Sequence, residues 1–259
     1  MGFDRNAAAD QAFGHKPVLL DECLDALDIK PEGIYLDGTL GRAGHSLEIA
    51  KRLTTGRLIC LDRDETAIQA AEIRLADYKD RVTLVHSNFS RIADVLQELD
   101  IDGVDGMLFD LGVSSPQLDE ADRGFSYMHD APLDMRMDRT AALTARDVVN
   151  GWSYEELRRI LFEYGEERYA PAIAKAIVKR RQESPIETTG QLVDIIRGAM
   201  PPAALREKQH PAKRSFQAIR IAVNDELGAI SQMMETAPDR LNKGGRRGPD
   251  AGPQPGAWR

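Results

Sequence analysis

A glycine-rich turn between an apolar run and a helical pattern constrains this chain more than any other stretch. Residues 34–36 have the length and composition of a buried strand, and Asp37 stands directly after them. Gly38, Gly41 and Gly44 follow at a spacing of three, and an apolar helical pattern then begins. The order predicts a strand, a tight turn and a helix.

Two interpretations of this turn are open. Glycines let the backbone approach a bound ligand closely, but the dinucleotide-binding turn has the spacing G-x-G-x-x-G, and here it is G-x-x-G-x-x-G. The carboxylate of Asp37 would repel a pyrophosphate, whereas it could accept a hydrogen bond from a cationic amino group such as that of S-adenosylmethionine. Equally, Asp37 and the glycines could form only a tight turn with a helix cap.

Length and composition indicate a soluble protein. The 259 residues suffice for one large domain or one domain with an insert. No apolar run approaches a membrane span and no signal peptide is evident, so we expect a cytoplasmic protein without membrane contact. The two cysteines and five scattered histidines have no disulfide or metal-ligand spacing, so we expect no metal site.

Charge is distributed unevenly along the chain. Residues 168–220 hold eleven Lys or Arg and four acidic residues, a net +7, which leaves −15 for the rest of a chain of net charge −8. Such asymmetry indicates either a polyanionic partner that contacts one region or a solvated basic helix face. The oligomeric state cannot be inferred from the sequence.

Four apolar runs alternate with helical patterns in the first half of the chain. They span residues 34–36, 57–61, 82–86 and 104–109. Such runs predict a parallel sheet that is covered on both faces, in which a ligand binds beyond the carboxyl ends of the strands. Asp37, Asp62, Phe89 and Asp110 all fall at or just after those ends.

Asp62 has a more specific interpretation. It lies about 20 residues after the glycine turn, where doubly wound nucleotide-binding folds place the carboxylate that binds ribose hydroxyls. It could instead cap the next helix, but Asp64 is better placed to cap a helix over residues 65–78. We therefore expect Asp62 to face the ligand.

From Asp119 the pattern changes to an inserted helical subdomain. Residues 119–150 show no clear period and are expected to form an ordered loop. Three helices should follow, two of them opened by the capping boxes at Ser153 and Thr188. A Pro-rich link over residues 200–211 leads into one long helix from about 213 to 236.

The segment Asp110-Leu-Gly-Val-Ser114-Ser115-Pro-Gln117 is the candidate reaction centre. Enzymes that methylate exocyclic amino groups of bases carry a short polar segment with a proline here, whose acceptors orient the amino nitrogen toward the methyl donor. We expect Asp110, Ser114 and Ser115 to orient the substrate in this way. A plain Ser-Pro turn is the alternative.

Several stretches together resemble the bacterial 16S ribosomal RNA cytidine N4-methyltransferase family, RsmH or MraW. They are His15–Leu20, Asp37–His45, Asp62–Asp64, Asp110–Gln117, Arg123–Ser126, Pro132–Asp138, Tyr164–Arg168 and His210–Ala218. The resemblance implies a class I S-adenosylmethionine-dependent methyltransferase, a Rossmann-like doubly wound α/β sheet with an inserted helical subdomain. It also implies a cytidine in the decoding region of 16S rRNA, on the small ribosomal subunit, as the substrate.

The resemblance also implies binding residues. S-adenosylmethionine contacts would fall on Ala43, Gly44, His45, Asp62, Phe89, Asp110 and Gln117, with Phe89 on the adenine. Asp37 and Gly38 are cofactor candidates from the glycine turn itself. RNA contact by the insert is a separate hypothesis, with Arg136, Lys213, Arg214 and Arg220 as candidates and Lys175, Lys179, Arg180 and Arg181 as a second patch. The expected domains are a flexible tail over 1–14, a cofactor-binding domain over 15–118, the insert over 119–212, a returning helix over 213–241 and a disordered tail over 242–259.

The sequence departs from the family pattern after Gly245. The family continues into further strands, whereas residues 247–259 show no strand pattern, as a reading-frame shift or an altered terminus would give. We expect the C-terminal strands to be missing, which would leave the strand at 104–109 with an open edge.

Two alternative functions make different demands on the sequence. A nucleotide-dependent oxidoreductase on a related fold would need G-x-G-x-x-G without the preceding carboxylate, and the chain shows neither feature. A catalytically impaired RNA-binding or assembly factor that keeps the cofactor fold is the second alternative. Incubation of small subunits with labelled S-adenosylmethionine distinguishes the two: the enzyme would label the RNA, whereas the factor would bind the subunit without labelling it.

Overall fold

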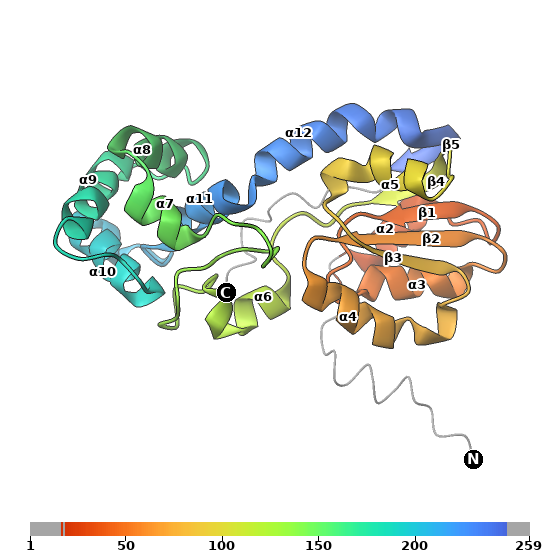
Figure 1. The fold of residues 1–259 in the computed structure, drawn as a ribbon, viewed down its shortest axis with the longest axis horizontal. Coiled ribbons are helices and arrows are strands. Elements are labelled where there is room, and N and C mark those ends of the chain that lie inside the picture. Colours follow the sequence, from red (N-terminus) through yellow and green to blue (C-terminus); the bar gives the residue numbers. More distant parts are fainter. Residues whose placement is uncertain (1–16, 18, 248–259) are drawn as a thin grey trace, which may run out of the picture. The chain divides into compact units, whose positions relative to one another are not determined.

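The computed structural model describes Pro17 and residues 19–247 (Figure 1). The predicted tail at 1–14 and residues 248–259 lie outside the described residues. The chain divides into two compact units, each described by itself below. The first comprises the described residues up to Gly112 and from Ala229 on, and the second comprises Val113–Gly228. The second unit therefore includes residues 213–224, which the sequence had suggested would return to the first.

A five-stranded sheet forms the centre of the first unit. Its strands are β1 (Ile34–Asp37), β2 (Arg57–Asp62), β3 (Val82–His86), β4 (Val104–Leu108) and β5 (Leu241–Arg247). They lie in the order β3-β2-β1-β4-β5, and every neighbouring pair is parallel. The predicted parallel α/β sheet is confirmed.

Both faces of this sheet are covered because side chains alternate along each strand. In β2, Leu58 and Cys60 join one buried cluster, and Ile59 and Leu61 join another. The first cluster includes residues of α2 (Leu20–Leu27), α3 (Gly44–Arg52) and α4 (Glu65–Arg74). The second includes residues of α5 (Ile92–Glu98) and, from α12 (Glu226–Thr236), Met233. The near-continuous apolar strands follow from this double burial.

The strand β5 corrects two expectations from the sequence. Residues 242–247 are ordered beside β4, and the edge of β4 is not open as the missing strands had implied. Leu241 packs into the apolar cluster of this unit, and the amide of Asn242 donates to Asp105 Oδ1 at 2.9 Å. Because β5 has only one apolar side chain, its strand conformation follows from pairing with β4 and not from a pattern of its own.

The second unit is helical. Its elements are α6 (Ser115–Asp119), α7 (Ala145–Gly151), α8 (Tyr154–Glu163), α9 (Ala170–Arg181), α10 (Thr189–Ala199) and α11 (Lys213–Asn224). Capping boxes begin α8 at Ser153 and α10 at Thr188, as predicted. A third, at Thr144 with Asp147, begins α7 inside the stretch that the sequence had suggested was a loop. This helix of seven residues is too short to show a period.

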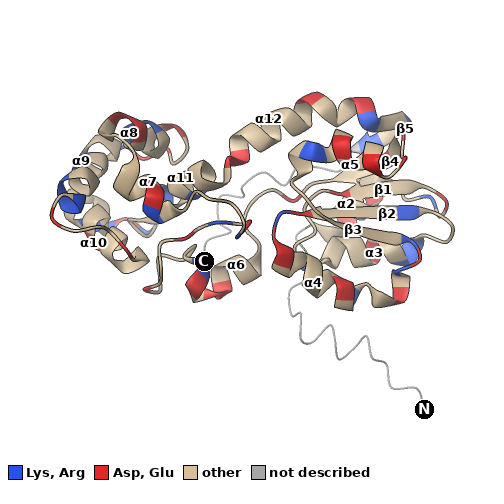
Figure 2. Cartoon of the chain, viewed as in Figure 1, with Lys and Arg blue, Asp and Glu red and all other residues tan. Residues whose placement is uncertain are grey.

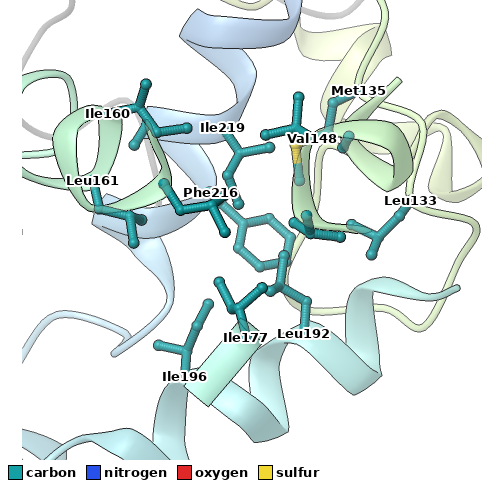
Figure 3. Packing of buried hydrophobic residues seen from close by; sticks show 14 of the residues in the cluster. Leu133, Met135, Val148, Ile160, Leu161, Ile177, Leu192, Ile196, Phe216 and Ile219 are labelled. Atoms are coloured by element: carbon teal, nitrogen blue, oxygen red, sulfur yellow. The ribbon is translucent and has the colours of Figure 1, made fainter. Parts of the chain in front are cut away.

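Phe216 of α11 lies among the apolar side chains of this second unit. It is 1% exposed, and Figure 3 shows Ile177, Leu192 and Ile219 around its ring. Residues from the irregular segment after α6, among them Leu133 and Met135, belong to the same cluster. The irregular segment is therefore part of the core.

The predicted long helix over residues 213–236 is two helices. Asp225 adopts a left-handed conformation, with φ 46° and ψ 44°, which ends α11 and precedes α12. Aspartate tolerates this conformation better than most residues, because its short polar side chain can hydrogen-bond locally. Apolar periodicity continues across the break, which is why the sequence did not reveal it. Among the described residues, no helix combines the length and apolar character that a membrane span requires.

Candidate functional site

Asp37 connects the glycine turn to the helix that follows. Its Oδ1 accepts a hydrogen bond from the backbone N–H of Thr39 at 3.1 Å, and its Oδ2 accepts one from the Ser46 hydroxyl at 2.6 Å. The side chain is 1% exposed, and burial raises the pKa of this carboxyl. The sequence left open whether Asp37 binds a ligand or only shapes the turn. The observed contacts show that it shapes the turn.

Asp62 supports the same turn from the neighbouring strand. Its Oδ2 accepts the N–H of Gly41 and its Oδ1 that of Asp64, each at 2.8 Å. Asp64 is the residue that caps α4, through the N–H of Thr66, so the expectation that Asp62 is not the cap is confirmed. Burial raises the pKa of Asp62 to about 6, because a carboxylate removed from water loses the solvation of its charge.

Gly38 lies against two aromatic rings. A Cβ added at Gly38 would stand 2.3 Å from Cε1 of Phe109 and 3.3 Å from Cβ of Phe89. The rings of Phe89 and Phe109 meet edge to face, with centroids 6.0 Å apart. Only glycine allows the turn to approach Phe109 so closely. The predicted cofactor residues Gly38 and Phe89 are thus brought together, with Phe89 only half-buried.

The helix α3 begins at this turn with an unusual backbone. Ala43 precedes it in the left-handed conformation, with φ 57°, and a Cβ at Gly44 would stand 2.4 Å from Cγ of Pro17. His45 is 8% exposed, and its Nε2 is buried without a hydrogen-bond partner among the described residues. A buried nitrogen without a partner is costly, so this position suits a polar ligand.

Asp110 brings the end of β4 to the same turn. Its backbone N–H donates to the Thr39 hydroxyl at 2.6 Å, and its side chain is exposed. The ends of β1, β2 and β4 are therefore tied to one glycine turn, and Phe89 after β3 touches it as well. This confirms the expectation that the strand ends gather their polar and aromatic side chains at one edge of the sheet.

Thr39 and Ser46 are functional candidates that the sequence reasoning missed. Both carry the hydroxyl groups that link the turn to Asp110 and Asp37. The available signal was the spacing: Thr39 follows Asp37 by two residues, as in a side-chain turn, and Ser46 lies in the first turn of the predicted helix.

Comparison with known proteins identifies the family. The model of the MraW methylase family matches residues 12–248. The chain belongs to this family. Ribosomal RNA small subunit methyltransferase H of Symbiobacterium thermophilum is 58% identical over 236 residues, which cover 91% of this chain and 74% of the relative. The protein of the same name from Brevibacillus brevis is 56% identical, covering 91% of this chain and 75% of the relative.

As a member of this methylase family, the protein has a class I fold and uses S-adenosylmethionine. The described residues fit that cofactor: carboxylates lie at the strand ends, glycines permit close approach, and the buried Nε2 of His45 lacks a partner. That Asp62 accepts ribose hydroxyls and that Phe89 packs on the adenine stay predictions, since the contacts observed for Asp62 are with the backbone N–H groups of Gly41 and Asp64.

Ser114, Ser115 and Gln117 of the methylase lie in its helical unit. The backbone N–H of Ser114 donates to Oε1 of Gln117 at 3.1 Å, an arrangement that caps the short helix α6. Gln117 is 5% exposed. Gln117 thus has a structural contact in addition to the cofactor contact that the resemblance implies.

Two of the four expected RNA contacts of the methylase have internal partners. Arg220 is 4% exposed and forms a bidentate ion pair with Glu226, at 2.7 and 2.9 Å. Arg136 pairs with Asp134 through Nε and Nη2, and its Nη1 donates to the carbonyls of Arg139 and Ala141. These internal contacts occupy both guanidinium groups, so we do not propose Arg136 or Arg220 as phosphate ligands.

The other two expected contacts lie at the start of α11. Arg214 is exposed and its Nη1 donates to the carbonyl of Glu166 at 2.9 Å, so no acid neutralises it in that contact. Lys213 is half-buried. Figure 2 shows further Lys and Arg residues on α9, whose last turn holds Lys179, Arg180 and Arg181.

Proposed function

We propose that this protein transfers the methyl group of S-adenosylmethionine to the exocyclic N4 of a cytidine in the decoding region of 16S rRNA, on the small ribosomal subunit in the cytoplasm. The observation that carries the proposal is the 58% identity over 91% of the chain to a protein named ribosomal RNA small subunit methyltransferase H. The site residues support the methyl-transfer part, and the cytidine rests on the motif resemblance.

The cofactor, when bound, supplies an electrophilic sulfonium methyl, so the protein mainly needs to hold and orient the two reactants. Asp62 accepts the ribose hydroxyls while it holds the glycine turn through Gly41. Phe89 packs on the adenine. Asp37 acts by keeping the turn in shape, with Ser46 and Thr39 as its hydrogen-bond donors.

The substrate amine is oriented by acceptors from the segment after β4. We assign Asp110, Ser114 and Ser115 to this role: their oxygens accept the N–H groups of the amine, so that its lone pair points at the methyl. The cofactor, when bound, would supply the methyl group and leave as the thioether, and the proton that the amine then releases would pass to water. Asp110 is exposed at the end of β4, where it can accept such a hydrogen bond.

Label transfer tests the proposal. Small subunits that lack the modification are incubated with methyl-labelled S-adenosylmethionine and the wild-type protein, and we expect one labelled cytidine in the decoding region. The Asp110→Asn variant should transfer the methyl at least about tenfold more slowly even at saturating S-adenosylmethionine. Tight binding to subunits without any label would instead indicate the non-catalytic assembly factor.

A further inference from the structure

Two segments shared with the family have no role in the cofactor site. They are Tyr164–Arg168 and His210–Ala218, and the structure brings them together around a pocket in the helical unit. Both the first segment and the start of the second contribute polar side chains to its wall. The polar residues that line the pocket are Glu167, Arg168, Glu207, Gln209, His210 and Arg214.

His210 lines this pocket with a neutral imidazole ring whose position is fixed by stacking. Its ring stacks on Tyr127 with centroids 4.4 Å apart and an interplanar angle of 11°, and Tyr127 in turn packs edge-on against Phe216. The N–H of Ala212 donates to Nδ1 of His210 at 3.2 Å, so the neutral ring carries its proton on Nε2. Burial, with a smaller effect from Arg197, lowers the pKa of His210 and favours this neutral donor.

Arg168 pairs with an acid at an exposed position, where a bound anion could take the place of that acid. It forms an ion pair with Glu207, and the two side chains are 59% and 52% exposed. An ion pair this exposed contributes little to stability, because water and salt screen it. Arg214 lines the same pocket and donates to a neutral carbonyl, so its charge is available. Two guanidinium groups and one neutral N–H donor therefore line one pocket together with two acids. Glu207 competes for Arg168, whereas Glu167 is 2% exposed and its Oε1 accepts the N–H of Tyr169.

We infer that this pocket binds a backbone phosphate of the RNA substrate, an inference that rests on the proposed function. Arg168 and Arg214 contact the phosphate oxygens, His210 donates from Nε2, and Glu207 is the acid that the phosphate displaces from Arg168. Guanidinium groups match phosphate geometry, and such contacts position an RNA without reading its sequence.

The inference predicts an unusual effect of Glu207 on RNA affinity. Removing its charge in Glu207→Gln should strengthen RNA binding, because the phosphate then does not have to displace an acid from Arg168. Arg168→Gln should weaken binding several-fold and lower the salt slope of log affinity by about 1. Arg168→Lys, which keeps the charge but not the fork, should restore the slope and only part of the affinity.

A matched pair on the same unit provides the control. Arg146 and Glu187 form a bidentate ion pair, are 47% and 49% exposed, and do not line the pocket. We would measure equilibrium binding of an RNA fragment of the 16S decoding region over a salt series, for both pairs of variants, with thermal melts to confirm folding. The inference is wrong if Glu207→Gln and Glu187→Gln shift the affinity equally, or if Arg168→Gln leaves the salt slope unchanged.

Methyl transfer separates this inference from the proposed function. If wild type labels the cytidine and the pocket variants bind RNA like their controls, the phosphate site fails and the function stands. If wild type gives no label while Glu207→Gln binds RNA more tightly than Glu187→Gln, the function fails and the site stands. In the expected result, the Arg168→Gln defect appears in KM for RNA, and kcat is unchanged.

Discussion

At the scale of single residues, the candidate site is built on acids that hold a backbone turn. Asp37 and Asp62 each accept hydrogen bonds from the turn or its helix, and both have raised pKa values because they are buried. The sequence predicted these positions from their place after strands. It could not predict that the turn's own N–H and hydroxyl groups would be their partners, since that depends on the path of the loop.

The raised pKa of Asp62 predicts a pH-dependent cofactor affinity. Ribose hydroxyls donate to the ionised carboxylate, and protonation begins as the pH falls to about 6. Affinity for S-adenosylmethionine should therefore be constant above about pH 7 and fall toward about tenfold per pH unit well below pH 6. Calorimetric titration across this range checks it. Asp62→Asn should bind weakly without this dependence, and a wild-type profile that is flat down to pH 5 would contradict the role of Asp62.

The Ser46 hydroxyl should contribute to stability through the buried carboxylate that it contacts. Ser46→Ala removes a 2.6 Å donor from Asp37, and loss of a hydrogen bond to a charged buried group costs about 1.5–3 kcal/mol. Urea denaturation measures this cost. The exposed Ser184, whose hydroxyl contacts Arg180, is the control, and Ser184→Ala should change stability by less than about 0.5 kcal/mol. Equal effects at both positions would show that Ser46 does not support Asp37.

At the scale of elements, local sequence signals predicted most of what the structure contains. The apolar runs became β1 to β4, and the capping boxes at Ser153 and Thr188 begin helices. The strand β5 and the break at Asp225 were missed. The strand β5 forms because it pairs with the edge of β4, and the helix break forms because one residue, Asp225, adopts a left-handed backbone. Neither feature produces a periodic pattern of apolar residues in the sequence.

The close approach of β1's turn to Phe109 makes Gly38 sensitive to the smallest substitution. In Gly38→Ala the new Cβ would meet the Phe109 ring at 2.3 Å, so the ring or the turn must shift, at a cost of about 1–3 kcal/mol. Cofactor affinity should fall as well, because Phe89 packs on Phe109. Denaturation and cofactor titration of the same variant measure both effects.

Gly198 in α10 is the control for this substitution. No atom lies within 4 Å of its added Cβ, so Gly198→Ala should stabilise by about 0.5–1 kcal/mol through helix propensity. A Gly38→Ala variant with unchanged stability and unchanged cofactor affinity would refute the close packing described for this turn.

At the scale of the whole molecule, the candidate residues are distributed over two compact units. The sheet unit holds the cofactor candidates except Gln117, and the helical unit holds Gln117 and the basic excess that the sequence places between residues 168 and 220. Charge counting predicted the region of this excess. It could not show which cations have internal partners, as Arg220 does with Glu226, because those pairings arise only when the helices pack.

Calorimetric titration of the full chain with S-adenosylmethionine tests the central claim, that the ends of β1 to β4 form the cofactor site. We predict one site, with affinity at least about tenfold weaker, or 1.4 kcal/mol, in Asp62→Ala and in Phe89→Ala. Asp94→Ala and Phe162→Ala, at exposed positions on α5 and α8, should bind like wild type. A folded wild-type protein that shows no binding, or equal affinity in all four variants, would contradict the account.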